Sequence, residues 1–229
     1  MSEPDIFYIL GNKVRRDLLS HLTCTECYFS LLSNKVSVSS TAVSKHLKIM
    51  EREGLLKSYE KEGKFIGPVR KYYKITLSNT YVVTVTPNLF WYKGIKLEEK
   101  PSLRKFEINL ENLDASPDTL QSMVINFIDA NKELGNLLEA LKTLESYRDM
   151  LVRSIKERYL DEIGDMTQLA ILHYLLLYGE ATIEDLSDRL NLKEREVIKK
   201  AEELNKFVPL IIKEDSIKID EEKLRKIVK

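Results

Sequence analysis

Residues 38–56 read VSSTAVSKHLKIMEREGLL, and this stretch decides the predicted fold. Ser39 is a residue type that caps helix N-termini, and Gly54 is the type that most often ends helices. The pattern predicts a helix over residues 40–53 with one buried stripe. The stripe consists of the apolar residues spaced four and three apart, which are Val43, Leu47 and Met50.

The opposite, polar face of this helix is typical of a helix that reads DNA. In a helix-turn-helix protein the first turns contact base edges, whereas cations further along contact phosphates. The candidate base-contacting residues, together with the cap, are Ser39, Ser40, Thr41, Ser44, Lys45 and His46. The candidate phosphate-contacting residues are Lys48 and Arg52. A solvated helix face without a ligand is the alternative interpretation.

The surrounding sequence predicts a winged helix-turn-helix domain over residues 1–78. Apolar spacing predicts a short first helix, a second helix capped by Asn12, and a third helix over residues 26–34. Two strand-like runs, 55–60 and 70–76, flank a glycine-containing loop and predict a two-stranded wing. The wing residues expected to contact the DNA backbone are Lys61, Lys64, Arg70 and Lys71.

The charge distribution favours a polyanion partner for the N-terminal part alone. The whole chain is neutral, with 36 Lys+Arg and 36 Asp+Glu. Residues 1–75 hold 13 basic and 8 acidic side chains, or +5, which leaves 23 basic and 28 acidic, or −5, for the remainder. A local excess of positive charge favours nucleic-acid binding. We therefore expect double-stranded DNA, as a palindromic promoter site, to be the partner.

The middle of the chain is predicted to connect the domains and to pair two subunits. Residues 79–116 show one alternating strand before Pro87 and then mixed, connecting sequence. Ser116 and Pro117 form a start signal for a long helix over residues 117–163. Positions spaced four and three apart predict the seam of a coiled-coil homodimer. The seam positions are Leu120, Val124, Phe127, Asn131, Leu134, Leu138 and Leu141. A helix packed on its own domain is the alternative.

Residues 164–229 repeat the order of helices and hairpin, which predicts a second winged-helix-like domain. Residues 165–229 hold 12 basic and 14 acidic side chains, or −2, and a DNA interface needs the opposite balance. We expect an effector or assembly module here, and contacts with the transcription machinery stay open. The predicted fold class is mainly α with small β wings (α+β).

The two cysteines of the chain, Cys24 and Cys27, form one C-x-x-C unit. Inert buried thiols, a zinc site, thioredoxin-type catalysis and a reversible redox switch compete as interpretations. Zinc needs four ligands, and His46 and His173 lie in other predicted elements, while thioredoxin-type catalysis needs an adjacent βαβ unit. Cysteines three apart can reach disulfide geometry, and a thiolate near a helix start is stabilised. A redox switch is therefore the favoured interpretation.

Residues 38–56 resemble the recognition region of the ArsR family of winged helix-turn-helix regulators, with its S-x-x-x-x-S-[RK]-H-L core. Residues 11–22, the cysteine pair and residues 164–174 carry a closer resemblance, to archaeal sulfur-response regulators. This resemblance implies a dimer that binds DNA while its C-x-x-C is reduced. It also implies that sulfur or polysulfide oxidises the pair and releases the DNA, which controls hydrogenase and sulfur-metabolism genes.

Several protein classes are disfavoured by the same sequence. No stretch approaches the ~20 apolar residues of a membrane span, and the N-terminus lacks the pattern of a secretory signal. We expect a cytoplasmic, soluble regulator rather than an enzyme, with no cofactor, no bound metal and no membrane partner. Two alternatives stay open: an ArsR-type metal-sensing repressor with the cysteines as ligands, and a C-x-x-C thiol–disulfide oxidoreductase.

Overall fold

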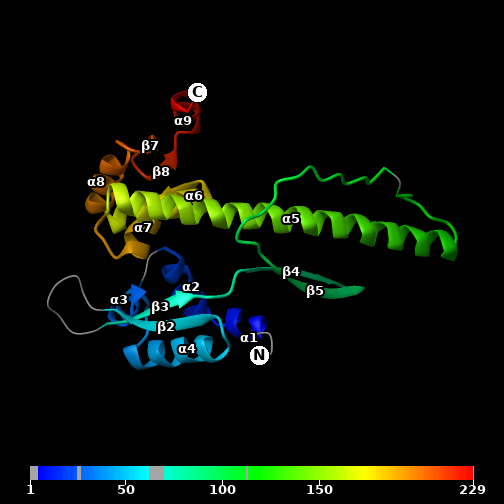
Figure 1. Cartoon of the computed structure of the whole chain (residues 1–229), viewed down its shortest axis with the longest axis horizontal. Helices are drawn as coiled ribbons and strands as arrows, with labels where there is room; N and C mark the ends of the chain where they lie inside the picture. Colours follow the sequence, from blue (N-terminus) through cyan, green and yellow to red (C-terminus); the bar gives the residue numbers. More distant parts are fainter. Residues whose placement is uncertain (1–4, 25–26, 62–69, 112, 229) are drawn as a thin grey trace. The chain divides into compact units, whose positions relative to one another are not determined.

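The structure is a computed structural model that describes residues 5–24, 27–61, 70–111 and 113–228 (Figure 1). It is mainly helical with small antiparallel sheets, which confirms the predicted fold class. The chain divides into two compact units, one of Met1–Leu77 with Lys156–Lys229 and one of Ser78–Ile155. The first unit contains both winged domains, and the second contains a hairpin and most of a long helix.

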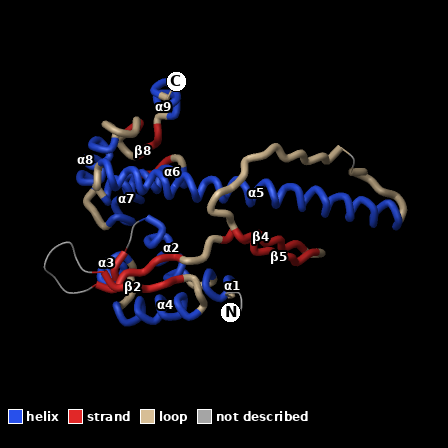
Figure 2. The backbone as a smooth tube through the Cα atoms, in the orientation of Figure 1, coloured by secondary structure: helices blue, strands red, loops and turns tan. Residues whose placement is uncertain are grey.

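The N-terminal domain is a winged helix-turn-helix, as predicted (Figure 2). Its elements are α1 (Ile6–Leu10), α2 (Lys13–Cys24), β1 (Cys27–Tyr28), α3 (Phe29–Lys35), α4 (Ser40–Arg52), β2 (Leu56–Lys61) and β3 (Arg70–Ile75). The strand order of the sheet is β1-β3-β2. β2 and β3 pair antiparallel from Leu56 opposite Ile75 to Lys61 opposite Arg70, and they form the wing.

Buried contacts between the first helices hold this domain together. The predicted apolar stripe of α4 is fully buried, and α4 packs against α2 and α3. Arg15 on α2 is also buried, with its Nε donating to the carbonyl oxygen of Ile9 at 2.9 Å. Its guanidinium lies 4.5 Å from the centre of the Tyr8 ring. Because a buried guanidinium needs such partners, these contacts fix α1 against α2.

The third helix differs from its predicted start. α3 begins at Phe29, whereas the predicted start, residue 26, lies outside the described residues. Between them the main chain forms β1, in which Cys27 lies opposite Tyr73 and Tyr28 lies opposite Tyr72 of β3. Pairing with a strand more than 40 residues away thus outweighs the local helical pattern. As a result, Cys27 does not lie in the first turn of a helix.

The second unit contains a hairpin of which sequence analysis predicted only the first strand. β4 (Asn79–Thr86) pairs with β5 (Leu89–Lys96) along its whole length, with Thr86 opposite Leu89 across a two-residue turn. Most of β5 is exposed on both faces, so its sequence shows no alternation of apolar and polar residues. The signal on which strand prediction depends is therefore missing from this strand.

α5 (Leu120–Glu162) is 43 residues long, which corresponds to roughly 65 Å. It begins later than the predicted residue 117. The main-chain N–H of Ser116 donates to Asp114 Oδ1 at 2.9 Å and closes a turn before the helix. Thr119 Oγ1 accepts from the N–H of Ser122 at 3.1 Å, so Thr119 rather than Ser116 caps the first turn.

The segment after β5 runs antiparallel to α5 within the second unit. Three contacts in sequence order join it to progressively earlier turns of the helix. They are Glu98 with Lys142 at 2.6 Å, Arg104 with Glu139 at 3.9 Å, and the N–H of Asn109 with Glu133 Oε2 at 3.0 Å. Residues 98–109 therefore lie along α5, the helix that the sequence predicts to pair two subunits.

The C-terminal domain is also winged-helix-like. Its elements are α6 (Met166–Tyr178), β6 (Glu180–Thr182), α7 (Ile183–Leu190), α8 (Glu194–Leu204), β7 (Leu210–Ile212), β8 (Ser216–Ile219) and α9 (Glu221–Ile227). The strand order β6-β8-β7 repeats the order of the N-terminal sheet. α8 therefore occupies in this domain the place that α4 occupies in the first.

Candidate nucleic-acid interface

α4 is the helix that the sequence singles out for DNA, and its N-terminus is capped as predicted. Ser39 Oγ accepts from the N–H of Ala42 at 3.3 Å, and Gly54 follows the helix with a φ of 78°. That positive φ favours glycine, which ends the helix there. Because one face of α4 is buried by the core, its hydroxyl and basic residues are held on the opposite face.

Six of the predicted contact residues line one open groove. It has a volume of about 830 Å³, and the predicted residues on it are Ser40, Thr41, Ser44, Lys45, Lys48 and Arg52. Sequence analysis missed three further lining residues, which are Tyr8, Phe29 and Ile49. Tyr8 and Phe29 come from α1 and α3, so no spacing within α4 could have found them. Aromatic and aliphatic groups beside cations suit contacts with bases as well as phosphates.

The carboxylates near α4 are turned away from this groove or paired. Glu51, the one acidic residue within α4, accepts from the N–H of Ser58 on β2 at 3.2 Å. Glu53, just after the helix, pairs with Arg52 at 2.9 Å. Within the described part of the chain, neither Lys45 nor Lys48 forms an ion pair. The groove therefore presents uncompensated positive charge to an anion such as a phosphate.

His46 is separated from the other predicted contact residues. It does not line the groove, and its Nδ1 is buried with no hydrogen-bond partner among the described residues. Burial lowers the pKa of His46, and Arg15 and Lys45 lower it further. The imidazole is therefore neutral at pH 7, and it offers no positive charge to DNA.

The wing carries two of its four predicted cations within the described residues. Arg70 and Lys71 are exposed on β3, and the Nζ of Lys71 lies 5.4 Å from the centre of the Tyr73 ring. Lys64 and the side chain of Lys61 lie outside the described residues. The tip of the wing is thus not part of the described interface.

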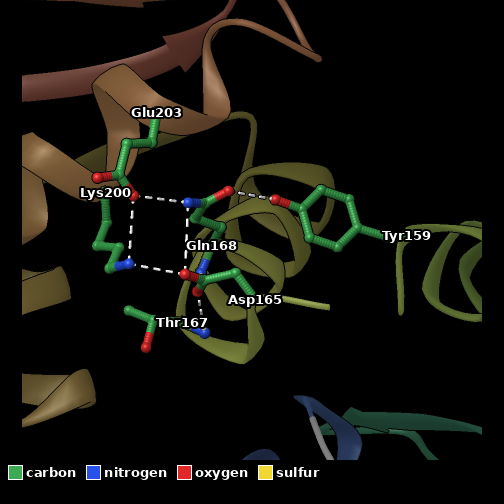
Figure 3. Close-up of polar contacts among 6 residues, drawn as sticks. All are labelled: Tyr159, Asp165, Thr167, Gln168, Lys200 and Glu203. Carbon is green, nitrogen blue, oxygen red and sulfur yellow. Dashed lines mark hydrogen bonds and ion pairs between the residues drawn. The ribbon is translucent and has the colours of Figure 1, made fainter. Parts of the chain in front are cut away.

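On α8, the corresponding helix of the C-terminal domain, Lys200 and Glu203 form contacts within the domain (Figure 3). Lys200 on α8 donates to Asp165 Oδ2 at 2.7 Å and to Glu203 Oε2 at 3.2 Å. Gln168 Nε2 donates to Glu203 at 2.8 Å, and the hydroxyl of Tyr159 donates to Gln168 Oε1 at 2.6 Å. This network joins the end of α5, the start of α6 and α8.

The pKa values in this network follow from its contacts. Burial raises the pKa of Asp165, but hydrogen bonds from Lys200 and from the first turn of α6 outweigh it, so the pKa is lowered overall. A hydrogen bond from Lys200 also lowers the pKa of Glu203. Burial, and next the charge of Asp165, raises the pKa of Tyr159 to about 12. Lys200 and Glu203 of α8 are therefore bound within the domain and do not face a ligand.

The cysteine pair lies where α2 gives way to the sheet. Cys24 is the last residue of α2, and Cys27 is the first residue of β1. The side chains of both cysteines, like residues 25 and 26, lie outside the described part of the structure. For the predicted redox switch, the structure therefore gives the position of the main chain of Cys24 and Cys27.

Comparison with known families decides the class of this domain. Residues 12–58 match the bacterial regulatory protein, arsR family. The match begins at the cap of α2 and ends in β2, so it contains the whole of α4. Residues 182–223 match the family described as PF0095-like, C-terminal domain. No curated protein matches the chain.

These matches support a coarse functional assignment. An ArsR-type helix-turn-helix indicates a DNA-binding transcriptional regulator, with double-stranded DNA as its partner. Among the described residues, no helix is both long and apolar enough to cross a membrane. The same part of the chain contains no cluster of three or more His, Cys, Asp or Glu residues arranged to hold a metal ion.

Proposed function

We propose that this protein is a homodimeric transcriptional regulator that binds a palindromic promoter site and responds to oxidation of Cys24 and Cys27. The observation that carries the proposal is the uncompensated basic groove on α4. Ser40, Thr41, Ser44 and Lys45 contact base edges in the major groove, whereas Lys48, Arg52 and the wing cations contact phosphates. The protein acts on chromosomal DNA in the cytoplasm.

The surface of α5 supports the dimer. Of the seven predicted seam positions, Leu120, Val124, Phe127, Asn131 and Leu134 are exposed in the single chain. Leu120 is 73% exposed and Phe127 is 60% exposed. Contiguous exposed apolar surface of this kind is costly for a monomer and typical of an interface. Leu138 is buried and Leu141 is half-buried, so the N-terminal half of α5 is the proposed pairing surface.

The position of the cysteine pair supports the redox response. Oxidation removes two protons and two electrons from the thiols, forms one S–S bond, and reduces the sulfur or polysulfide acceptor. The new bond constrains the junction of α2 with β1, and α2 packs against α4 while β1 pairs with β3 of the wing. The elements that carry Cys24 and Cys27 therefore contact both α4 and the wing. By resemblance, the regulated genes serve hydrogenase and sulfur metabolism.

DNA affinity of the reduced and oxidised proteins, measured side by side, tests this proposal. Wild-type protein is expected to lose affinity for its promoter fragment on oxidation, because losing two or three base contacts at ~1–3 kcal/mol each weakens binding by about 30-fold or more. Cys24→Ser protein is expected to bind like the reduced form and to ignore the oxidant. Equal affinity of both wild-type forms contradicts the redox response. Stoichiometric metal retained by the reduced protein favours the metal-sensor alternative instead.

A further inference from the structure

A cavity of about 220 Å³ lies within the first compact unit, away from the α4 groove. Its lining residues come from α2 and α3 of the N-terminal domain and, in the C-terminal domain, from α6, α7 and the turn after α7. The wall is mostly apolar, because α6 contributes the helical face with Met166, Ala170 and Leu177, and α7 contributes Leu186 and Leu190. Small-molecule sites are typically concave and apolar with a few polar groups.

His173 is the polar group that sets this cavity apart. It lines the cavity from α6 and is 4% exposed, and within the described structure neither of its ring nitrogens has a hydrogen-bond partner. Burial lowers the pKa of His173 to about 4, and Lys156 contributes. The imidazole is therefore neutral at pH 7, with one donor and one acceptor nitrogen unused. Because an unsatisfied buried polar group costs stability, a bound molecule that completes it is favoured.

The charge of the lining residues specifies the sign of that molecule. Lys35 on α3 and Arg189 on α7 both line the cavity, and none of its described lining residues carries a carboxylate. The Arg189 guanidinium lies 4.8 Å from the centre of the Tyr174 ring, and it forms no ion pair in the described part of the chain. Lys35 Nζ donates to the main-chain oxygen of Leu190 at 3.5 Å, and it forms no ion pair among the described residues. Two cations without a carboxylate partner favour an anionic ligand.

We propose that this cavity binds a small organic acid, with a single ring or an apolar body of that size and one carboxylate group. An apolar cavity of about 150 Å³ holds benzene, so this larger one has room for a ring with a carboxylate. The ring lies against the apolar faces of α6 and α7. The carboxylate accepts hydrogen bonds from Arg189, Lys35 and the ring N–H of His173.

The position of the cavity makes its ligand an effector. Lys35 joins α3 to α7 on one side, and Lys156 Nζ donates to the carbonyl oxygen of Thr23 near the end of α2 on another. α2 lines the cavity through Ser20 and His21, packs against α4, and ends at the cysteine pair. A molecule seated against α2 therefore biases the helix that positions α4. This regulatory step rests on the proposed DNA binding, whereas the binding site itself does not.

Calorimetry and thermal melting of the full chain, without DNA, test the site. The probes are benzoate, phenylacetate and cyclohexanecarboxylate at up to about 10 mM, a range suited to ligands of so few atoms. The neutral matched compound is benzamide, and acetate tests the anion alone. At least one ring carboxylate is expected to bind at one site per chain and to raise the melting temperature. Absence of binding by all three acids, or equal binding of benzamide, overturns the proposal.

Two variants and one control locate the bound molecule. Arg189→Gln is expected to weaken binding about tenfold to hundredfold, because it removes a charged hydrogen bond. His173→Leu is expected to weaken binding to a similar degree while it leaves the ligand-free protein equally or more stable, since it removes an unsatisfied polar group. Arg195→Gln, on the exposed first turn of α8, is the matched control and is expected to bind like wild type. Unchanged affinity in both cavity variants overturns the assignment.

Promoter affinity with and without the bound acid then tests the coupling. A changed affinity in wild type that is absent in His173→Leu supports the effector role. If the acid binds but promoter affinity is unchanged, the site stands and the effector role fails. If the protein binds no promoter at all, the proposed function fails, and the calorimetric result on the site still holds.

Discussion

The N-terminal and C-terminal winged domains share one order of elements and one sheet order, β1-β3-β2 and β6-β8-β7. Their third helices differ in charge. α4 holds three basic residues and one acidic residue, or +2, whereas α8 holds three basic and four acidic, or −1. In α4 the acidic residue is turned towards β2 and the cations line a groove. In α8 a central cation, Lys200, is bound by two carboxylates of its own domain.

The winged fold therefore does not by itself specify a DNA-binding domain. The fold supplies an amphipathic helix with one exposed face, and the residues on that face decide its use. On α4, Lys45 and Lys48 form no ion pair within the described part of the chain, so a polyanion is their best partner. On α8, Lys200 is already bound by the carboxylates of Asp165 and Glu203. We therefore expect the C-terminal domain to have a structural or regulatory role and not to bind DNA itself.

Charge reversal on α4 and on α8 is expected to have very different effects on DNA binding. Lys45→Glu with Lys48→Glu is expected to weaken promoter binding by about 10²- to 10⁴-fold, because two charged contacts at ~1.5–3 kcal/mol each are lost. The matched pair on α8, Arg195→Glu with Lys199→Glu, is expected to leave promoter affinity nearly unchanged. Fluorescence anisotropy with a promoter fragment measures both. Equal losses from the two pairs contradict the division of roles.

Disruption of the proposed dimer is expected to give the next largest change. Leu134→Asp puts a charge on the exposed face of α5 and is expected to produce monomers. Because the two half-sites are then no longer bound by one molecule, affinity for a palindromic site should fall roughly 10²-fold. Light scattering gives the mass, and anisotropy gives the affinity. If the variant stays dimeric, the alternative is favoured, in which α5 packs within its own chain.

Asp165 tests the structural role of the C-terminal network. Its Oδ1 accepts from the N–H groups of Thr167 and Gln168, both at 2.9 Å, and caps α6. Asp165→Ala is expected to lower the free energy of unfolding by about 1–2 kcal/mol, as loss of an N-cap does. Promoter affinity of the folded variant should match wild type. Chemical denaturation measures stability, and a large loss of DNA affinity at full folding would give this domain a direct role in binding.

The smallest expected effect is a pH dependence of stability. The pKa values of Asp165 and Glu203 are lowered in the folded protein, so the unfolded chain takes up their protons more readily. Their contribution to stability is present at pH 7 and is lost as the pH falls below the ordinary carboxyl range, about 4. Asp165→Asn is expected to lose less melting temperature than wild type between about pH 7 and pH 3. An identical decrease in both proteins contradicts the assigned ion pair.

How much could be predicted from the sequence depended on how local each signal was. The cap, stripe and outer face of α4 follow from residues within a few turns of one another, and they were predicted correctly. β1 was missed because its partner strand lies more than 40 residues further along the chain. Packing between separate helices places Tyr8 and Phe29 in the groove and His46 outside it, so residue spacing along α4 could not predict either. The cavity at His173 was invisible for the same reason, since its walls are about 150 residues apart in the sequence.

Hydrogen–deuterium exchange of the whole protein with and without promoter DNA shows directly which of the two winged domains binds DNA. The two winged domains are compared in one sample, so each serves as the control for the other. We expect DNA to slow amide exchange in peptides that cover Ser40–Arg52 and to leave exchange in peptides that cover Glu194–Leu204 unchanged. Protection of α8 equal to that of α4, or no protection of α4, would contradict this expectation.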